Sequence, residues 1–127
     1  MDSLASAMDP ARKRDLFRRG LDCFNQQRFF TCHELLEEIW LEEPEEEKLF
    51  YQGLIQLAAA FHHYQRSNLT GMESLLCAGV EKLCRYPPSY LGVDLAALLA
   101  ALEPWLDRVA RREPLENLRL PAIETAR

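Results

Sequence analysis

The chain has 127 residues, of which 48% are hydrophobic and 28% are charged, and its formal net charge is -5. These values fit one globular domain and exclude a chain that is disordered throughout. The acidic balance argues against a general affinity for nucleic acid or for anionic membranes.

Two further features bear on the compartment and the cysteines. The sequence has no apolar run near the roughly 20 residues that span a bilayer, and the segment before Pro10 is too short and too acidic for a signal peptide. We therefore expect a cytoplasmic protein with no membrane partner. The cysteines lack the spacings of structural zinc sites, so we expect buried thiols, not disulfides. They are Cys23, Cys32, Cys77 and Cys84.

The first part of the chain predicts a helical hairpin. Asp9 followed by a proline is typical of a helix start, and apolar residues at helical spacing extend the predicted helix over 10–27. Thr31 and Glu34 have the spacing of a capping box, in which two side chains satisfy the first backbone amides of a helix. They predict a second helix over 32–41.

The middle of the chain predicts a second hairpin. Pro44 and the glutamates after it are typical of a helix start, and the third helix should extend to about Arg66. This helix is apolar nearly all round, which favours a central, buried position. Thr70 and Glu73 form another capping box, and the fourth helix should end near Tyr86, before two prolines.

The last predicted helix starts at Asp94 and carries an apolar stripe as far as Val109. Pro104 falls inside this stripe, so we expect a kink or a break there. The division of the chain that follows is a flexible leader over 1–8, a single helical domain over 9–112 and an extended tail over 113–127.

These elements predict an all-α fold, a compact bundle of about five helices built on two helical hairpins, with the third helix central and buried. The two capping boxes lie roughly 40 residues apart, a period found in helical-hairpin repeats. A two-repeat array resembling the tetratricopeptide class is therefore an alternative architecture.

The densest group of chemically versatile side chains is His33, Glu37 and Trp40. Helical geometry places them within an arc of about 60°, on the border between the apolar and the charged faces of the second helix. Three interpretations are open. The residues could be structural, with the histidine and the carboxylate paired at the i, i+4 spacing; they could bind a small ligand or a metal; or the pair could act as a general acid and base.

A polar stripe on the third helix supplies an opposing wall. Gln52, Gln56, Ala59 and His63 share one narrow arc, whereas His62 points elsewhere, so His63 is the better candidate. The candidate ligand-binding residues are His33, Glu37, Trp40, Gln52, Gln56 and His63. Of these, His33, Glu37 and His63 are the predicted ligands of a divalent metal such as zinc, iron or manganese.

The leading hypothesis is thus a metal or small polar ligand between the second and third helices. An alternative is a protein-interaction scaffold in which the motif only locks one hairpin to the next. A hydrolase-type enzyme is the third hypothesis. The identity of a partner and the oligomeric state do not follow from these patterns.

The joint pattern resembles the bacterial and archaeal domain-of-unknown-function family 309. The residues that carry the resemblance are His33, Glu37, Trp40, Gln52 to Gln56, Ala58 to Ala60, His63, Asn68 and Gly71. It covers about Leu16 to Leu98 and implies an all-helical fold with a His-x-x-x-Glu-x-x-Trp motif that is suspected of binding metal. The chain departs from the family at Ser67, where glycine is usual, and at Met72, where a small residue is usual.

Overall fold

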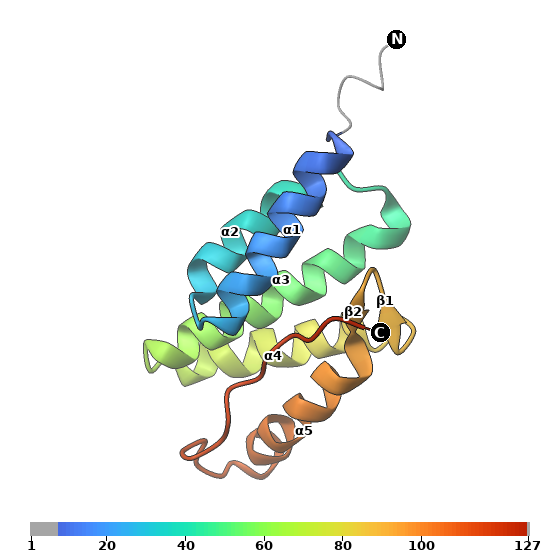
Figure 1. Ribbon diagram of the computed structural model, residues 1–127. Coiled ribbons are helices and arrows are strands. Elements are labelled where there is room, and N and C mark those ends of the chain that lie inside the picture. Colours follow the sequence, from blue (N-terminus) through green and yellow to red (C-terminus); the bar gives the residue numbers. More distant parts are fainter. Residues whose placement is uncertain (1–7, 127) are drawn as a thin grey trace.

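A computed structural model describes residues 8–126, and within them the chain forms five α-helices and one short β-hairpin (Figure 1). The elements are α1 (Pro10–Asn25), α2 (Phe29–Trp40), α3 (Glu45–Gln65), α4 (Leu69–Leu83), β1 (Ser89–Tyr90), β2 (Val93–Asp94) and α5 (Leu95–Arg111). The predicted all-α fold with five helices is confirmed. None of the helices in the described part of the chain is long and apolar enough to cross a membrane.

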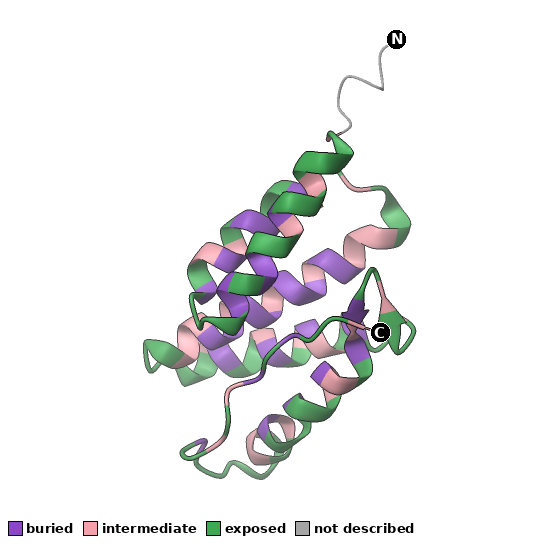
Figure 2. Ribbon diagram, in the orientation of Figure 1, coloured by how far each residue is buried: buried purple, intermediate pink, exposed green. Residues whose placement is uncertain are grey.

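Helix α3 is the centre of the molecule, as predicted. It packs against α2 on one side and α4 on the other, and buried residues follow its length in Figure 2. Phe50, Leu54, Leu57 and Phe61 are fully excluded from solvent. Burial of these large side chains is the main source of stability for a domain of this size, at roughly 1.5–3 kcal/mol for each side chain.

Two helix starts agree with the sequence. A carboxylate oxygen of Asp9 accepts a hydrogen bond from the Arg12 amide at 3.1 Å, ahead of α1. Asp94 does the same for the amide of Ala97 at 3.0 Å, ahead of α5. Each carboxylate satisfies an amide that the helix itself leaves free.

The two predicted capping boxes are wrong. Helix α2 begins at Phe29 with Arg28 at the N-cap, and α4 begins at Leu69 with Asn68 at the N-cap. The reason lies in the preceding turns, where Gln27 and Ser67 adopt left-handed φ values of 64° and 62°. This conformation reverses the chain within a few residues, so each new helix starts before the threonine is reached.

Helix α5 runs unbroken through Pro104 from Leu95 to Arg111, so the predicted break is absent from it. The proline lacks the amide that would pair with the carbonyl of Ala100. Both residues are exposed, so water can satisfy that carbonyl at little cost.

A lysine of α1 forms ion pairs with two glutamates near the start of α3. Lys13 Nζ is 2.6 Å from Glu43 Oε1 and 3.5 Å from Glu47 Oε1. The Glu43 side chain is only 5% exposed. Burial raises the pKa of the Glu43 carboxyl, and the Lys13 ammonium offsets part of that rise. These contacts tie the start of α1 to the loop between α2 and α3 and to the first turn of α3.

The β-hairpin and the segment after α5 were not predicted in this form. Leu91 and Gly92 form the hairpin turn, both with positive φ. Residues 113–126 form no helix, and they return across the molecule to the hairpin (Figure 1). Residues 1–7 of the predicted leader lie outside the described residues, and the division into leader, domain and tail stays a prediction.

Candidate functional site

An open cleft of about 220 Å³ lies between α2 and α3, and one residue of α4 also lines it. We call it the α2–α3 cleft. Its lining residues are His33, Glu37, Trp40, Gln52, Ile55, Gln56, Ala59 and Leu75. The structure therefore brings together five of the six candidate site residues. Ile55 and Leu75 also line the cleft, and neither was among the predicted site residues.

Helix geometry explains this convergence. His33, Glu37 and Trp40 follow one another at spacings of four and three residues, so they form a single stripe along α2. On α3, Gln52, Gln56 and Ala59 repeat the same spacings and lie opposite. The small Ala59 side chain leaves the space that the cleft occupies.

His63 does not line the cleft, contrary to the prediction. Its Nδ1 atom is 3.0 Å from Nδ2 of Asn68, in the turn that begins α4. The Asn68 amide offers a hydrogen bond there, and that contact directs the imidazole away from Gln56 and the cleft. His62 also lies elsewhere, with its ring 5.2 Å from that of the exposed Phe30.

The predicted metal ligands are therefore not assembled. Within residues 8–126 there is no group of three or more His, Cys, Asp or Glu side chains that could hold a metal ion. His33 and Glu37 remain together, but a zinc site takes three or four ligands from the protein. The side chains present do not fit the predicted zinc, iron or manganese site.

The cleft contains an unusual set of polar atoms. Within the described part of the chain, three buried side-chain nitrogen or oxygen atoms have no hydrogen-bond partner, and all three belong to residues of the cleft. They are His33 Nδ1, Trp40 Nε1 and Gln56 Oε1. Folded proteins satisfy nearly all such atoms, because each one left unpaired costs about 1–3 kcal/mol. Three such atoms in one cleft are therefore an exception to the usual pairing of buried polar groups.

Charged side chains lie near these residues but do not hydrogen-bond to the unpaired atoms. His33 Nε2 lies 4.0 Å from Glu37 Oε2, which is too far for a hydrogen bond. Lys48 Nζ is 4.9 Å from the centre of the Trp40 ring, at cation–π distance. The Glu37 side chain is 49% exposed. The rim thus offers a carboxylate and an ammonium group, while the unpaired atoms lie deeper.

His33 belongs to a group of aromatic rings that extends to Phe30 and His62, neither of which lines the cleft. Phe30 lies 5.9 Å from His33 and 5.2 Å from His62, between centroids. Burial lowers the pKa of His62, and the positive charge of Arg66 acts in the same direction. The His62 ring packs against that of Phe30.

Comparison with known proteins matches residues 17–75 to the family model described as "Domain of unknown function (DUF309)". This range contains all the residues of the α2–α3 cleft and ends at Leu75. It leaves out the β-hairpin, α5 and the segment that follows.

Two relatives support the same family. The chain is 31% identical over 96 residues to "Uncharacterized protein YpuF" of Bacillus subtilis (strain 168). The aligned region covers 73% of this chain and 55% of that protein. It is 30% identical over 94 residues to an "Uncharacterized protein" of Aquifex aeolicus (strain VF5), covering 73% of this chain and 28% of that protein. The chain thus spans about half the length of the first relative, or less in the case of the second. Through residues 17–75, which carry the whole cleft, the chain belongs to the DUF309 family.

Proposed function

We propose that the α2–α3 cleft binds a small molecule that both donates and accepts hydrogen bonds. The observation that carries the proposal is that three unpaired buried polar atoms all belong to residues that line one cleft. A ligand that pairs with these atoms recovers free energy that folding leaves unused.

The atoms define the chemistry of the ligand. Trp40 Nε1 can only donate, and Gln56 Oε1 can only accept. His33 Nδ1 is an acceptor when the ring carries its proton on Nε2, the nitrogen that faces Glu37. A primary amide or ureido group offers the complement, with one carbonyl oxygen for the indole and N–H groups for the two acceptors.

The size and the walls of the cleft narrow the choice further. About 220 Å³ is less than the roughly 300–1,000 Å³ of sites for drug-sized ligands. Ile55, Ala59 and Leu75 supply an apolar wall for a short hydrocarbon part. Because the three polar atoms are shielded from water, a side chain must rotate to admit the ligand, and Trp40 and Gln56 are only half-buried.

The two tryptophans provide a direct test by nuclear magnetic resonance. Trp105 Nε1 donates a 3.0 Å hydrogen bond to the carbonyl of Arg119, whereas Trp40 Nε1 lacks a partner in the described chain. We expect acetamide to shift the indole N–H signal of Trp40 in a saturable way, with a Kd of about 1 mM or weaker for so small a probe. Trp105 is the internal control, and its signal should stay in place.

Acetate offers only acceptors and methylamine only donors, so both should bind more weakly than acetamide.

A Gln56→Leu variant should lose the acetamide response. Its free energy of unfolding should equal or slightly exceed that of the parent, because the substitution removes an unpaired polar group. Gln65→Leu, at the end of the same helix, is the matched control and should keep the response.

The same variant distinguishes binding from the scaffold alternative. If the motif only locks two hairpins together, Gln56→Leu should lower stability and acetamide should leave the Trp40 signal unmoved. The separation of 4.0 Å between His33 and Glu37 already argues against a tight lock in this region.

A further inference from the structure

Residues 121–126 cross the molecule as an extended strand between α1 and β2 (Figure 1). Most of their specific contacts are made by the backbone. The amide of Asp94 donates to the carbonyl of Glu124 at 2.8 Å, and the amide of Ala126 donates to the carbonyl of Gly92 at 2.9 Å. Thr125 pairs with Val93 as an antiparallel bridge. The segment thus lies along the free edge of the two-stranded hairpin and is joined to it by one antiparallel bridge.

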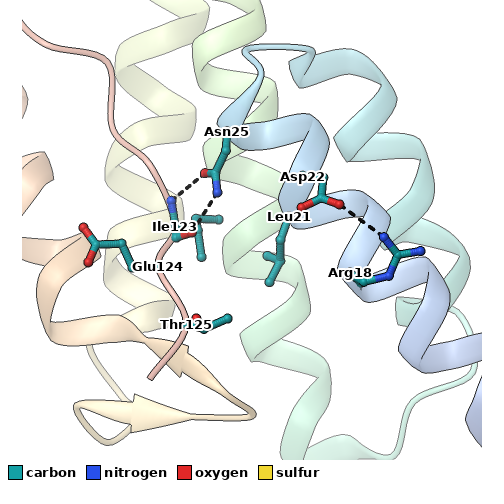
Figure 3. Close-up of a pocket in the computed structure, with 7 residues that line it drawn as sticks. All are labelled: Arg18, Leu21, Asp22, Asn25, Ile123, Glu124 and Thr125. Carbon is teal, nitrogen blue, oxygen red and sulfur yellow. Dashed lines mark hydrogen bonds and ion pairs between the residues drawn. The ribbon is translucent and has the colours of Figure 1, made fainter. Parts of the chain in front are cut away.

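Asn25, at the end of α1, forms two hydrogen bonds with the same segment on its other side. Its Nδ2 donates to the carbonyl of Ile123 at 2.9 Å, and its Oδ1 accepts from the amide of Ile123 at 2.7 Å. Figure 3 shows the Asn25 amide facing this peptide unit, with the Glu124 side chain pointing away from α1. A single carboxamide that satisfies both polar groups of one residue recognises an extended backbone, independently of the side chains next to it.

Two buried side chains, those of Pro121 and Ile123, supply the remaining anchors. Ile123 is 3% exposed and belongs to the core, while its neighbours Ala122 and Glu124 are exposed. This alternation is the pattern of a strand held at a sheet edge with alternate side chains buried.

Two surface pockets flank this strand. One, of about 380 Å³, is lined by Arg18, Asp22 and Thr125 among others. The other, of about 570 Å³, lies between α5 and residues 118–122. Because Arg18, Asp22 and Thr125 are exposed, the strand is open to solvent along part of its length.

We propose that Asn25 and β2 form a groove for an extended protein segment, which residues 121–126 occupy as an internal ligand. The partner that fits is an extended peptide segment with a β-branched aliphatic side chain at the position of Ile123 and small or polar residues beside it. Such a segment displaces residues 121–126 and makes the same backbone hydrogen bonds.

A labelled peptide with the sequence of residues 118–126, Leu-Arg-Leu-Pro-Ala-Ile-Glu-Thr-Ala, tests the proposal by fluorescence anisotropy. In the full chain the internal segment competes at a high effective concentration, so the peptide should bind weakly. In Ile123→Asp the internal segment is weakened, and the peptide should bind at least ~10-fold more tightly. A peptide with aspartate in place of its isoleucine should not bind.

Two additional variants keep the test decisive. Ala126→Pro removes the amide that pairs with Gly92 but leaves the Ile123 anchor in place, and it should also increase peptide binding. Adding Asn25→Leu to either variant should abolish binding, whereas Gln26→Leu, at the exposed neighbouring position, should not. If the folded Ile123→Asp and Ala126→Pro proteins both ignore the peptide, or accept the aspartate peptide equally well, the groove does not bind extended segments.

Discussion

Asn68 performs two tasks at one turn. Its Oδ1 accepts a hydrogen bond from the amide of Gly71 at 3.1 Å and so begins α4, while its Nδ2 faces Nδ1 of His63 at 3.0 Å. Because the Asn68 amide donates to Nδ1, a neutral His63 carries its proton on Nε2. One side chain therefore caps a helix and directs a histidine away from the cleft.

The roles of Asn68 and Thr70 can be separated by substitution. Asn68→Ala should lower the free energy of unfolding by about 0.5–2 kcal/mol, because it removes the N-cap acceptor. Thr70→Ala should change it by less than about 0.5 kcal/mol, since Thr70 is exposed and lies inside the first turn of α4. Urea unfolding of both variants checks the difference. Equal losses would contradict the assignment of Asn68 as the cap.

Residue patterns could not identify this cap because they lacked the turn. The spacing of Thr70 and Glu73 is that of a capping box, but the left-handed conformation of Ser67 starts the helix at Leu69. Glycine adopts that conformation without strain, so it is the residue that a turn of this kind favours at position 67.

Two glycines set the separation between α3 and α4. A Cβ atom on Gly79 would lie 2.9 Å from the carbonyl oxygen of Gly53, and one on Gly53 would meet the side chain of Leu83 at 2.8 Å. The backbones of the two helices are therefore nearly in contact at this point. Such an approach fixes their crossing and with it the position of Leu75 at the cleft.

Gly79→Ala should push these helices apart. We expect a net loss of about 1–2 kcal/mol in the free energy of unfolding, because the clash with a backbone atom outweighs the better helix propensity of alanine. Cys77→Ala, on the exposed side of α4, should have little effect and is the control. Chemical denaturation measures both, and a Gly79→Ala protein as stable as its parent would refute the close contact.

At the level of elements, the sequence was sufficient to predict five helices and the central α3, because apolar periodicity and two aspartate caps are local signals. The facing stripes of α2 and α3 followed from the same periodicity. The absence of His63 from the cleft was not predictable in this way, because the Asn68 side chain competes for it. The docking of residues 113–126 was equally hidden, since its partners lie far away in the sequence.

The four cysteines differ in burial, so their reactivity is a measure of how well the core is packed. Cys23 and Cys32 are buried, whereas Cys77 and Cys84 are exposed on α4 and just beyond it. The prediction of buried thiols therefore holds for only half of the cysteines. Burial raises the pKa of Cys32 to about 12, which suppresses the reactive thiolate.

Ellman's reagent should count two thiols in the native chain and all four in denaturant. Reaction of the buried pair should follow the rate of unfolding, because the core must open to admit the reagent. Cys77→Ser should reduce the native count to a single thiol. Four fast thiols in the native protein would contradict the buried core.

The hydrogen bonds between Asn25 and Ile123 join residues 98 positions apart. The two hairpins of α1 to α4 rely on contacts between neighbouring elements, which form early during folding, whereas a contact across so long a loop carries a large entropic cost and forms late. We therefore expect the C-terminal segment to form its contacts late in folding and to open more readily than the two hairpins. The α2–α3 cleft, which lies wholly within the early-forming hairpins, keeps its shape through such openings.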